Sequence, residues 1–182
     1  MTDQPPKKTS RPLTPQRLEN IALHYLERFS ASTESLRRAL LRRAERSAQE
    51  HGTDRGEAAG WIDALIQRYV ASGLLNDALF AEARTASLHR RGGSTRMIRQ
   101  KLAAKGVGAD DIDRALDERR EATDGEPDLE AALALCRRRR LGPYRPAEKR
   151  TEMRDKDLAA LGRGGFDYAT ARAAVDWRED ED

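Results

Sequence analysis

Aromatic residues, cysteine and long apolar runs are all scarce in this sequence. Phe, Trp and Tyr make up 5% of its 182 residues, which excludes a large aromatic core. The single cysteine, Cys136, has no partner for an internal disulfide, so a reducing compartment is expected. No segment approaches the roughly 20 consecutive apolar residues of a membrane span. The N-terminus also lacks the apolar middle region of a signal peptide. We therefore expect a cytoplasmic protein without membrane-spanning segments.

Charged residues are abundant instead, at 36%, and good helix formers such as Ala, Leu, Arg and Glu dominate the composition. The formal net charge is only +3, but it is unevenly distributed. Residues 76–120 carry ten basic and seven acidic groups, and residues 129–177 carry eleven and seven. The segments 121–128 and 178–182 are acidic. Two basic blocks separated by acidic segments favour an anionic partner, although solvated helix faces would give the same pattern.

The most informative pattern is an internal repeat. The stretch 88–107 is strongly basic, and no Asp or Glu occurs between Ala83 and Ala109. A shift of 62 positions aligns it, without a gap, with an earlier stretch. The matched positions are Arg28 with Arg90, Ser32 with Ser94, Thr33 with Thr95, Leu36 with Ile98, Arg37 with Arg99 and Leu40 with Leu102. A basic residue, a Ser-Thr helix start and an apolar pair at i, i+4 therefore occur twice, which indicates a repeat architecture.

Apolar spacing and capping residues predict three sets of three helices. In the first set, helices begin at Thr14-Pro15, near Ser32 and near Ala58, with a polar loop over 47–57. The second set follows Asn76-Asp77 and has helices over about 77–91, 94–106 and 110–116. The third has helices over about 129–136, 147–161 and 167–177. Because no run of alternating β-branched residues occurs, we predict no strands.

The fold class predicted is therefore all-α, an elongated tandem repeat of three three-helix modules. Modules of this size have marginal cores alone and are expected to stack end to end. The expected organisation is a disordered tail over 1–13, modules over 14–75, 76–120 and 129–177, an acidic linker over 121–128 and an acidic tail over 178–182.

Signals of catalysis or metal binding have simpler structural explanations. None of the three histidines has a Cys or His partner at zinc spacing. Cys136 lies on an apolar stripe, where a small core residue is expected. The carboxylates Asp110, Asp111 and Asp113 lie in the first turn of a predicted helix, where negative charge interacts favourably with the helix dipole. We therefore expect a non-enzymatic protein without a metal or cofactor site.

Signals of binding are stronger. Arg96 and Arg99 are three positions apart, opposite the apolar side of their predicted helix, and are expected to face solvent. Arg90 and Arg91 end the preceding helix, where they either pair with carboxylates or phosphates or simply complement the helix dipole. Four consecutive arginines, 137–140, would cover every side of a helix, so at least one must face the protein or a partner.

Recognition of a DNA base sequence is not indicated. A helix-turn-helix interpretation of residues 80–105 provides no recognition helix rich in Asn, Gln and Arg. Exposed aromatic residues that could stack on single strands are also scarce. Any nucleic-acid binding is therefore expected to involve the backbone and to be weak and salt-sensitive.

Three stretches resemble the bacterial RecX family of regulatory proteins. They are HYLERFSASTESLRRALLRRA, WIDALIQRYVASGLLNDALFAEA, and HRRGGSTRMIRQKLAAKGV followed by DIDRALD. The most specific features are the joint from Gly73 to Ala81 and the basic Gly, Ile-x-x-x-Leu, Lys-Gly pattern after it. The resemblance covers about Leu18 to Val175. The turn GRGGF in the third module departs from the family pattern, which usually has a basic pair before Gly-Phe.

This resemblance implies tandem three-helix repeats and a function. RecX-like proteins bind the RecA recombinase filament on DNA, lie along its groove and modulate it, usually by inhibiting extension, ATP hydrolysis and strand exchange. They are cytoplasmic, are linked to recombinational repair and carry no catalytic residues of their own.

On this basis we expect a monomeric regulator of a RecA filament, with weak contacts to the DNA backbone. The alternative is a standalone helical protein that binds nucleic-acid backbone. The residues expected to contact RecA or DNA are Arg28, Arg37, Arg90, Arg91, Arg96, Arg99, Lys101, Lys105, Arg137 and Arg138.

Overall fold

The computed structural model describes residues 11–178, and every regular element in this range is helical. The absence of strands from these residues confirms the all-α prediction. The chain divides into two compact units, Met1–Asn76 and Asp77–Asp182, here called unit 1 and unit 2. No helix within 11–178 is long and apolar enough to cross a membrane. The predictions for residues 1–10 and 179–182, in the two tails, lie outside the described residues.

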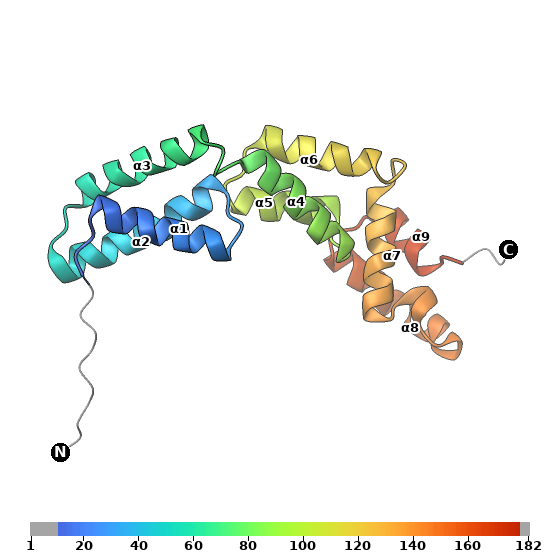
Figure 1. The fold of residues 1–182 in the computed structure, drawn as a ribbon. Coiled ribbons are helices and arrows are strands. Elements are labelled where there is room, and N and C mark those ends of the chain that lie inside the picture. The colour runs from blue at the N-terminus through green and yellow to red at the C-terminus, as the bar shows by residue number, and fades with distance from the viewer. Residues whose placement is uncertain (1–10, 179–182) are drawn as a thin grey trace, which may run out of the picture. The chain divides into compact units, whose positions relative to one another are not determined.

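Unit 1 contains three helices, α1 (Pro15–Arg28), α2 (Thr33–His51) and α3 (Arg55–Ala71), which pack on one another (Figure 1). Each helix begins at a capping side chain whose oxygen accepts a hydrogen bond from a backbone N–H three residues later. These caps are Thr14, Ser32 and Asp54. The caps at Thr14 and Ser32 confirm the predicted starts of the first two helices.

Two parts of unit 1 are more ordered than the sequence predicts. The loop expected over 47–57 is short, because α2 continues to His51 and Asp54 caps α3 from Arg55 onward. Leu13, which the sequence places in the tail, is instead a core residue. It is 5% exposed, and its backbone N–H donates to Ser47 Oγ at 2.9 Å.

Unit 2 contains two three-helix sets. The first comprises α4 (Asp77–Arg90), α5 (Thr95–Ala104) and α6 (Ala109–Glu121), and the second α7 (Pro127–Arg139), α8 (Ala147–Arg163) and α9 (Tyr168–Val175) with a short 3-10 helix, η1 (Gly142–Tyr144), between α7 and α8. Each set has its own hydrophobic cluster. Ile98 and Leu102, the apolar pair of the repeat, are completely buried in the first of these clusters, as are their counterparts Leu36 and Leu40 in unit 1.

The second set of unit 2 buries an ion pair beside its hydrophobic cluster. Asp157 on α8 is 1% exposed and accepts hydrogen bonds from Arg145 Nη2 at 2.6 Å, Arg145 Nε at 3.0 Å and the Gly142 N–H at 2.8 Å. Burial alone would raise the pKa of Asp157, but the hydrogen bonds from Arg145 and Gly142 outweigh it, so the pKa lies below its usual value. This carboxylate therefore anchors the loop between α7 and α8.

Candidate partner-binding surface

Four predicted contact residues are exposed around the α4–α5 turn. Arg90 is the last residue of α4, Arg91 lies in the turn, and Arg96 and Lys101 lie on α5. Within residues 11–178, none of these four side chains forms a salt bridge with another residue. Their charge is therefore available to an anionic partner. We call Arg90, Arg91, Arg96 and Lys101 the α4–α5 basic set.

Arg37 and Arg99, which occupy equivalent repeat positions, are instead paired inside their own three-helix sets. Arg37 on α2 pairs with Asp63 on α3, and Arg99 Nη2 on α5 lies 2.5 Å from Asp113 Oδ1 on α6. The C-terminal set has an analogous link, because Arg154 on α8 makes two hydrogen bonds, of 2.9 and 2.6 Å, to Asp176 after α9. An arginine on the middle helix of each set thus holds a carboxylate on or just after the third helix.

The Gly92-Gly93-Ser94-Thr95 turn is buried between the two sets of unit 2. A Cβ atom on Gly92 would lie 2.6 Å from the backbone nitrogen of Leu135 on α7, and Gly92 has a φ of 77°. Ser94 Oγ caps α5 and donates to the carbonyl of Gly164 at 2.8 Å. The backbone N–H and hydroxyl of Thr95 both donate to the Asp128 carboxylate. This turn therefore serves mainly to join the two three-helix sets of unit 2.

His89 belongs to the same junction. It is 1% exposed, and its Nε2 donates to the carbonyl of Pro127 at 2.7 Å, so the ring links the end of α4 to the start of α7. This packing agrees with the prediction that His89 is structural. The exposed arginines 90 and 91 therefore follow a histidine that is held in place by the second set.

The remaining predicted contact residues are exposed at helix ends. Arg28 ends α1 with its guanidinium 6.0 Å from the centre of the Phe29 ring, and Lys105 caps the end of α5. Arg137 lies 5.3 Å from the centre of the Tyr144 ring and Arg138 faces solvent. Arg140 leaves the helix with a φ of 55°, so the arginine run does not cover a complete helical turn. All four arginines of the run are exposed, and Arg137 also contacts the Tyr144 ring.

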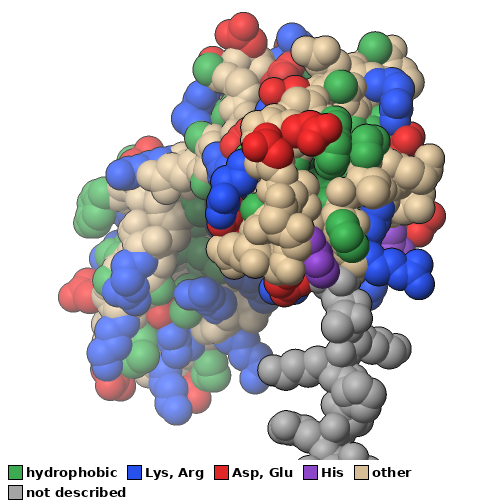
Figure 2. Space-filling view, turned by 90° about the vertical axis from the view of Figure 1, so that its left-hand side faces the viewer, with side chains coloured by type: hydrophobic (Ala, Val, Ile, Leu, Met, Phe, Trp, Pro, Cys, Tyr) green, Lys and Arg blue, Asp and Glu red, His purple; other side chains and the backbone are tan. Residues whose placement is uncertain are grey.

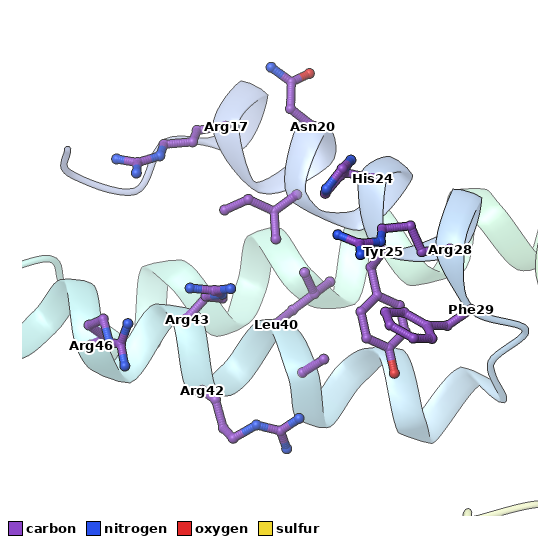
Figure 3. A pocket seen from close by; sticks show the side chains of 12 residues that line it. Arg17, Asn20, His24, Tyr25, Arg28, Phe29, Leu40, Arg42, Arg43 and Arg46 are labelled. Carbon is purple, nitrogen blue, oxygen red and sulfur yellow. The ribbon is translucent and has the colours of Figure 1, made fainter. Parts of the chain in front are cut away.

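The structure also shows a basic groove that the sequence-based prediction missed. It lies between α1 and α2, has a volume of about 790 Å³, and its lining includes Arg17, Arg28, Arg42, Arg43 and Arg46 (Figure 3). Of these, only Arg28 was a predicted contact residue. The spacing of Arg42, Arg43 and Arg46 would place cations on one side of α2, but the opposite wall depends on how α1 packs against α2.

Basic side chains are not confined to one patch. Figure 2 shows Lys and Arg interspersed with acidic and hydrophobic side chains over the face that it draws. The net charge of +3 therefore says little about where an anion would bind. Local geometry and the pairing of each guanidinium are more informative than the overall charge.

The cysteine and two of the three carboxylates that were weighed as catalytic groups are buried in a core or paired with arginines. Cys136 is completely buried, and burial raises the pKa of its thiol to about 11. Asp113 is paired with Arg99, and Asp111 with Arg114 on the same helix. Among the described residues, no cluster of three or more His, Cys, Asp or Glu is arranged to hold a metal ion.

Comparisons with known proteins give a consistent result. A sequence model of the second three-helix domain of RecX matches residues 76–116. "Regulatory protein RecX" of Myxococcus xanthus is 44% identical over 170 residues, covering 93% of this chain and 89% of the relative. Proteins of the same name from Agrobacterium fabrum and Halorhodospira halophila are 32% and 31% identical, covering 88% and 84% of this chain and 81% and 93% of the relatives. No solved structure matches the chain significantly.

The matched segment 76–116 contains α4, α5 and the first part of α6, and therefore includes the α4–α5 basic set. The similarity to the Myxococcus xanthus protein extends across nearly the whole chain. Sequence similarity and the repeated three-helix sets thus agree, and the chain belongs to the RecX family of regulatory proteins.

Proposed function

We propose that this protein binds the RecA recombinase filament on DNA and inhibits its extension, ATP hydrolysis and strand exchange, without catalysing a reaction itself. The observation that carries the proposal is the α4–α5 basic set, which is exposed, makes no internal salt bridge among the described residues, and lies in the segment that matches the family. Guanidinium groups of this kind pair well with carboxylates and phosphates, the anions of a protein filament on DNA.

The proposed mechanism uses several weak contacts together. Arg137 and Arg138 on α7 provide a second exposed group within unit 2, next to its C-terminal three-helix set. Binding through linked sites makes each later contact intramolecular, which raises the overall affinity without strengthening any single contact. The protein inhibits if it binds one filament geometry more tightly than the other, because only differential affinity shifts a conformational equilibrium.

Arg37 and Arg99 have a smaller role in this proposal. Each is engaged by a carboxylate of its own set, although both pairs are partly exposed. Exposed ion pairs contribute about 0–1 kcal/mol, so either arginine can exchange its internal partner for an external one at little cost. We assign them first to holding adjacent helices and second to contacting the partner.

The test is the steady-state ATPase activity of the cognate recombinase on single-stranded DNA. Wild-type protein should suppress it, and Arg91→Glu/Arg96→Glu should require at least about tenfold more protein for the same suppression. One charge-assisted contact contributes about 1.5–3 kcal/mol, and 1.4 kcal/mol corresponds to tenfold.

The matched control is Arg114→Glu/Arg172→Glu, which makes the same charge change in the same unit outside the α4–α5 basic set. It should inhibit like the wild type. An ATPase rate that stays unchanged in an excess of wild-type protein would refute the proposal. Equal loss of inhibition by both double variants would show that general charge, and not this surface, is responsible.

A further inference from the structure

The groove between α1 and α2 in unit 1 has an apolar floor and basic walls. Its floor includes Ile21 and Leu40, and Figure 3 shows Arg17 at one end and the rings of Tyr25 and Phe29 at the other. Arg17 and Arg28 are 11 positions apart on α1, which corresponds to about 16 Å along the helix axis at a rise of 1.5 Å per residue. The groove is therefore long enough for an extended ligand.

The arginines of this groove differ in pairing from other arginines of unit 1. Arg37, Arg38, Arg55 and Arg68 each form a salt bridge with a carboxylate of the unit. In contrast, four arginines of the groove form no salt bridge within residues 11–178, namely Arg28, Arg42, Arg43 and Arg46. No Asp or Glu is among the described residues that line the groove. Like charges gathered without counter-charges favour an anionic ligand.

An exposed aromatic platform lies at the end of this basic row. The Phe29 side chain is 53% exposed, although large apolar side chains are normally buried. Its ring centre lies 5.3 Å from that of Tyr25, and the Arg28 guanidinium lies 6.0 Å from the Phe29 ring centre. Tyr25 thus supports one part of the Phe29 ring while the rest remains accessible. A flat aromatic surface beside arginines is the combination on which nucleic-acid bases stack.

We propose that the α1–α2 groove binds a single strand of nucleic acid, with phosphates along the arginines and a base stacked on Phe29. An acidic peptide would satisfy the arginines equally well, but it would leave the exposed Phe29 ring without a role. Apart from Asn20, the described residues that line the groove carry no side-chain amide that could read a base, which predicts little sequence preference. This inference goes beyond the binding of a recombinase filament and does not depend on it.

The test is an anisotropy titration of a labelled oligothymidylate with the full chain, without recombinase, at several salt concentrations. Each phosphate contact to a single strand contributes about −0.7 to the slope of log affinity against log salt. Arg42→Gln/Arg46→Gln should therefore make the slope shallower by about 1.4. Phe29→Ala should weaken binding by about fivefold or more and leave the slope unchanged, because stacking does not release counterions.

Two matched variants make the result specific. Arg55→Gln/Arg68→Gln removes the same charge from unit 1 outside the groove and should leave the slope unchanged. Arg42→Lys/Arg46→Lys keeps the charge and should retain the wild-type slope. Fluorescence of Trp61, which packs against the core of unit 1, checks in a Trp177→Phe background that unit 1 of each variant is folded.

Three outcomes would overturn the inference. They are no binding of oligothymidylate, equal loss of slope in the two Arg→Gln double variants, and an unaffected affinity of Phe29→Ala together with efficient displacement of the oligonucleotide by polyglutamate. The last outcome would assign the groove to an acidic peptide. Because the assay contains no recombinase, its result is separate from that of the ATPase test.

Discussion

In both copies of the repeat the middle helix begins at a serine cap, but the turn before the cap differs in sequence and in contacts. Ser32 caps α2 in unit 1 and Ser94 caps α5 in unit 2. The two positions before each cap are Ser30 and Ala31 in unit 1, whereas they are glycines in unit 2. In unit 2 the backbone of another helix set, at Leu135 on α7, approaches this turn closely. Glycine in this turn therefore marks the docking of a second set.

The buried pair of Asp157 and Arg145 gives the largest expected difference between the units. Asp157→Ala should lower the free energy of unfolding of unit 2 by about 3–5 kcal/mol, because it leaves Arg145 partly buried without its carboxylate. Unit 1 should be unaffected. Chemical denaturation in a Trp61→Phe background, in which Trp177 of unit 2 is the reporter, measures the loss, and a Trp177→Phe background provides the control.

An acid titration of the same variant provides a second control. The pKa of Asp157 is lowered in the folded protein, so its contribution to stability is complete above the unfolded value near 3.8 and is lost as pH falls through the folded value. Unit 2 of the wild type should lose stability in this range, and Asp157→Ala should lose less. An equal acid dependence of the two proteins would contradict the assignment of this carboxylate as an anchor.

The next largest loss of stability is expected where Gly92 lies against the backbone of Leu135. Gly92→Ala should destabilise unit 2 by about 2–5 kcal/mol, because overpacking contributes about 1–3 kcal/mol and a left-handed φ contributes about 1–2 kcal/mol for a residue with a Cβ. The control is Gly52→Ala, at a similar φ of 72° but with no atom within 4 Å of the added Cβ. If both substitutions have the same effect on thermal unfolding, the turn does not depend on docking.

The smallest effect compares the two caps directly. Ser32→Ala should cost unit 1 about 1 kcal/mol, the usual effect of losing an N-cap. Ser94→Ala should cost unit 2 about 0.5–1.5 kcal/mol more, because the Ser94 hydroxyl donates to the Gly164 carbonyl of the other helix set and links the two sets, whereas the Ser32 hydroxyl donates to Ser35 on its own helix. Denaturant midpoints of the single variants and the wild type give both values. A larger loss at Ser32 than at Ser94 would reverse the comparison.

Most of the helical organisation could be predicted from the sequence, because caps and apolar spacing are local signals. Thr14-Pro15, Ser32 and Ser94 begin helices as expected, and the i, i+4 apolar pairs are buried. The start of α3 was placed too late, since Asp54 caps it from within a polar stretch that resembles a loop. Local signals thus identify the elements better than their ends.

The surface was harder to predict, because pairing depends on which helices meet. Arg99 was expected to face solvent, and it is half exposed, but its partner Asp113 comes from the neighbouring helix. The sequence places the Gly92-Gly93 turn next to the arginines expected to bind a partner, but the contacts of this turn are with Leu135 and Gly164 inside unit 2. Likewise, the arginines of α2 become part of a groove only when α1 provides the opposite wall.

The burial of Cys136 has a practical consequence. With a thiol pKa of about 11, roughly one molecule in ten thousand carries the reactive thiolate at neutral pH, and the sulfur is also shielded by the core. The native chain should therefore behave toward maleimide dyes almost as a cysteine-free protein. A cysteine introduced on the surface of each unit could be labelled without removing the natural one, so that fluorescence energy transfer would follow the separation of the two units in solution.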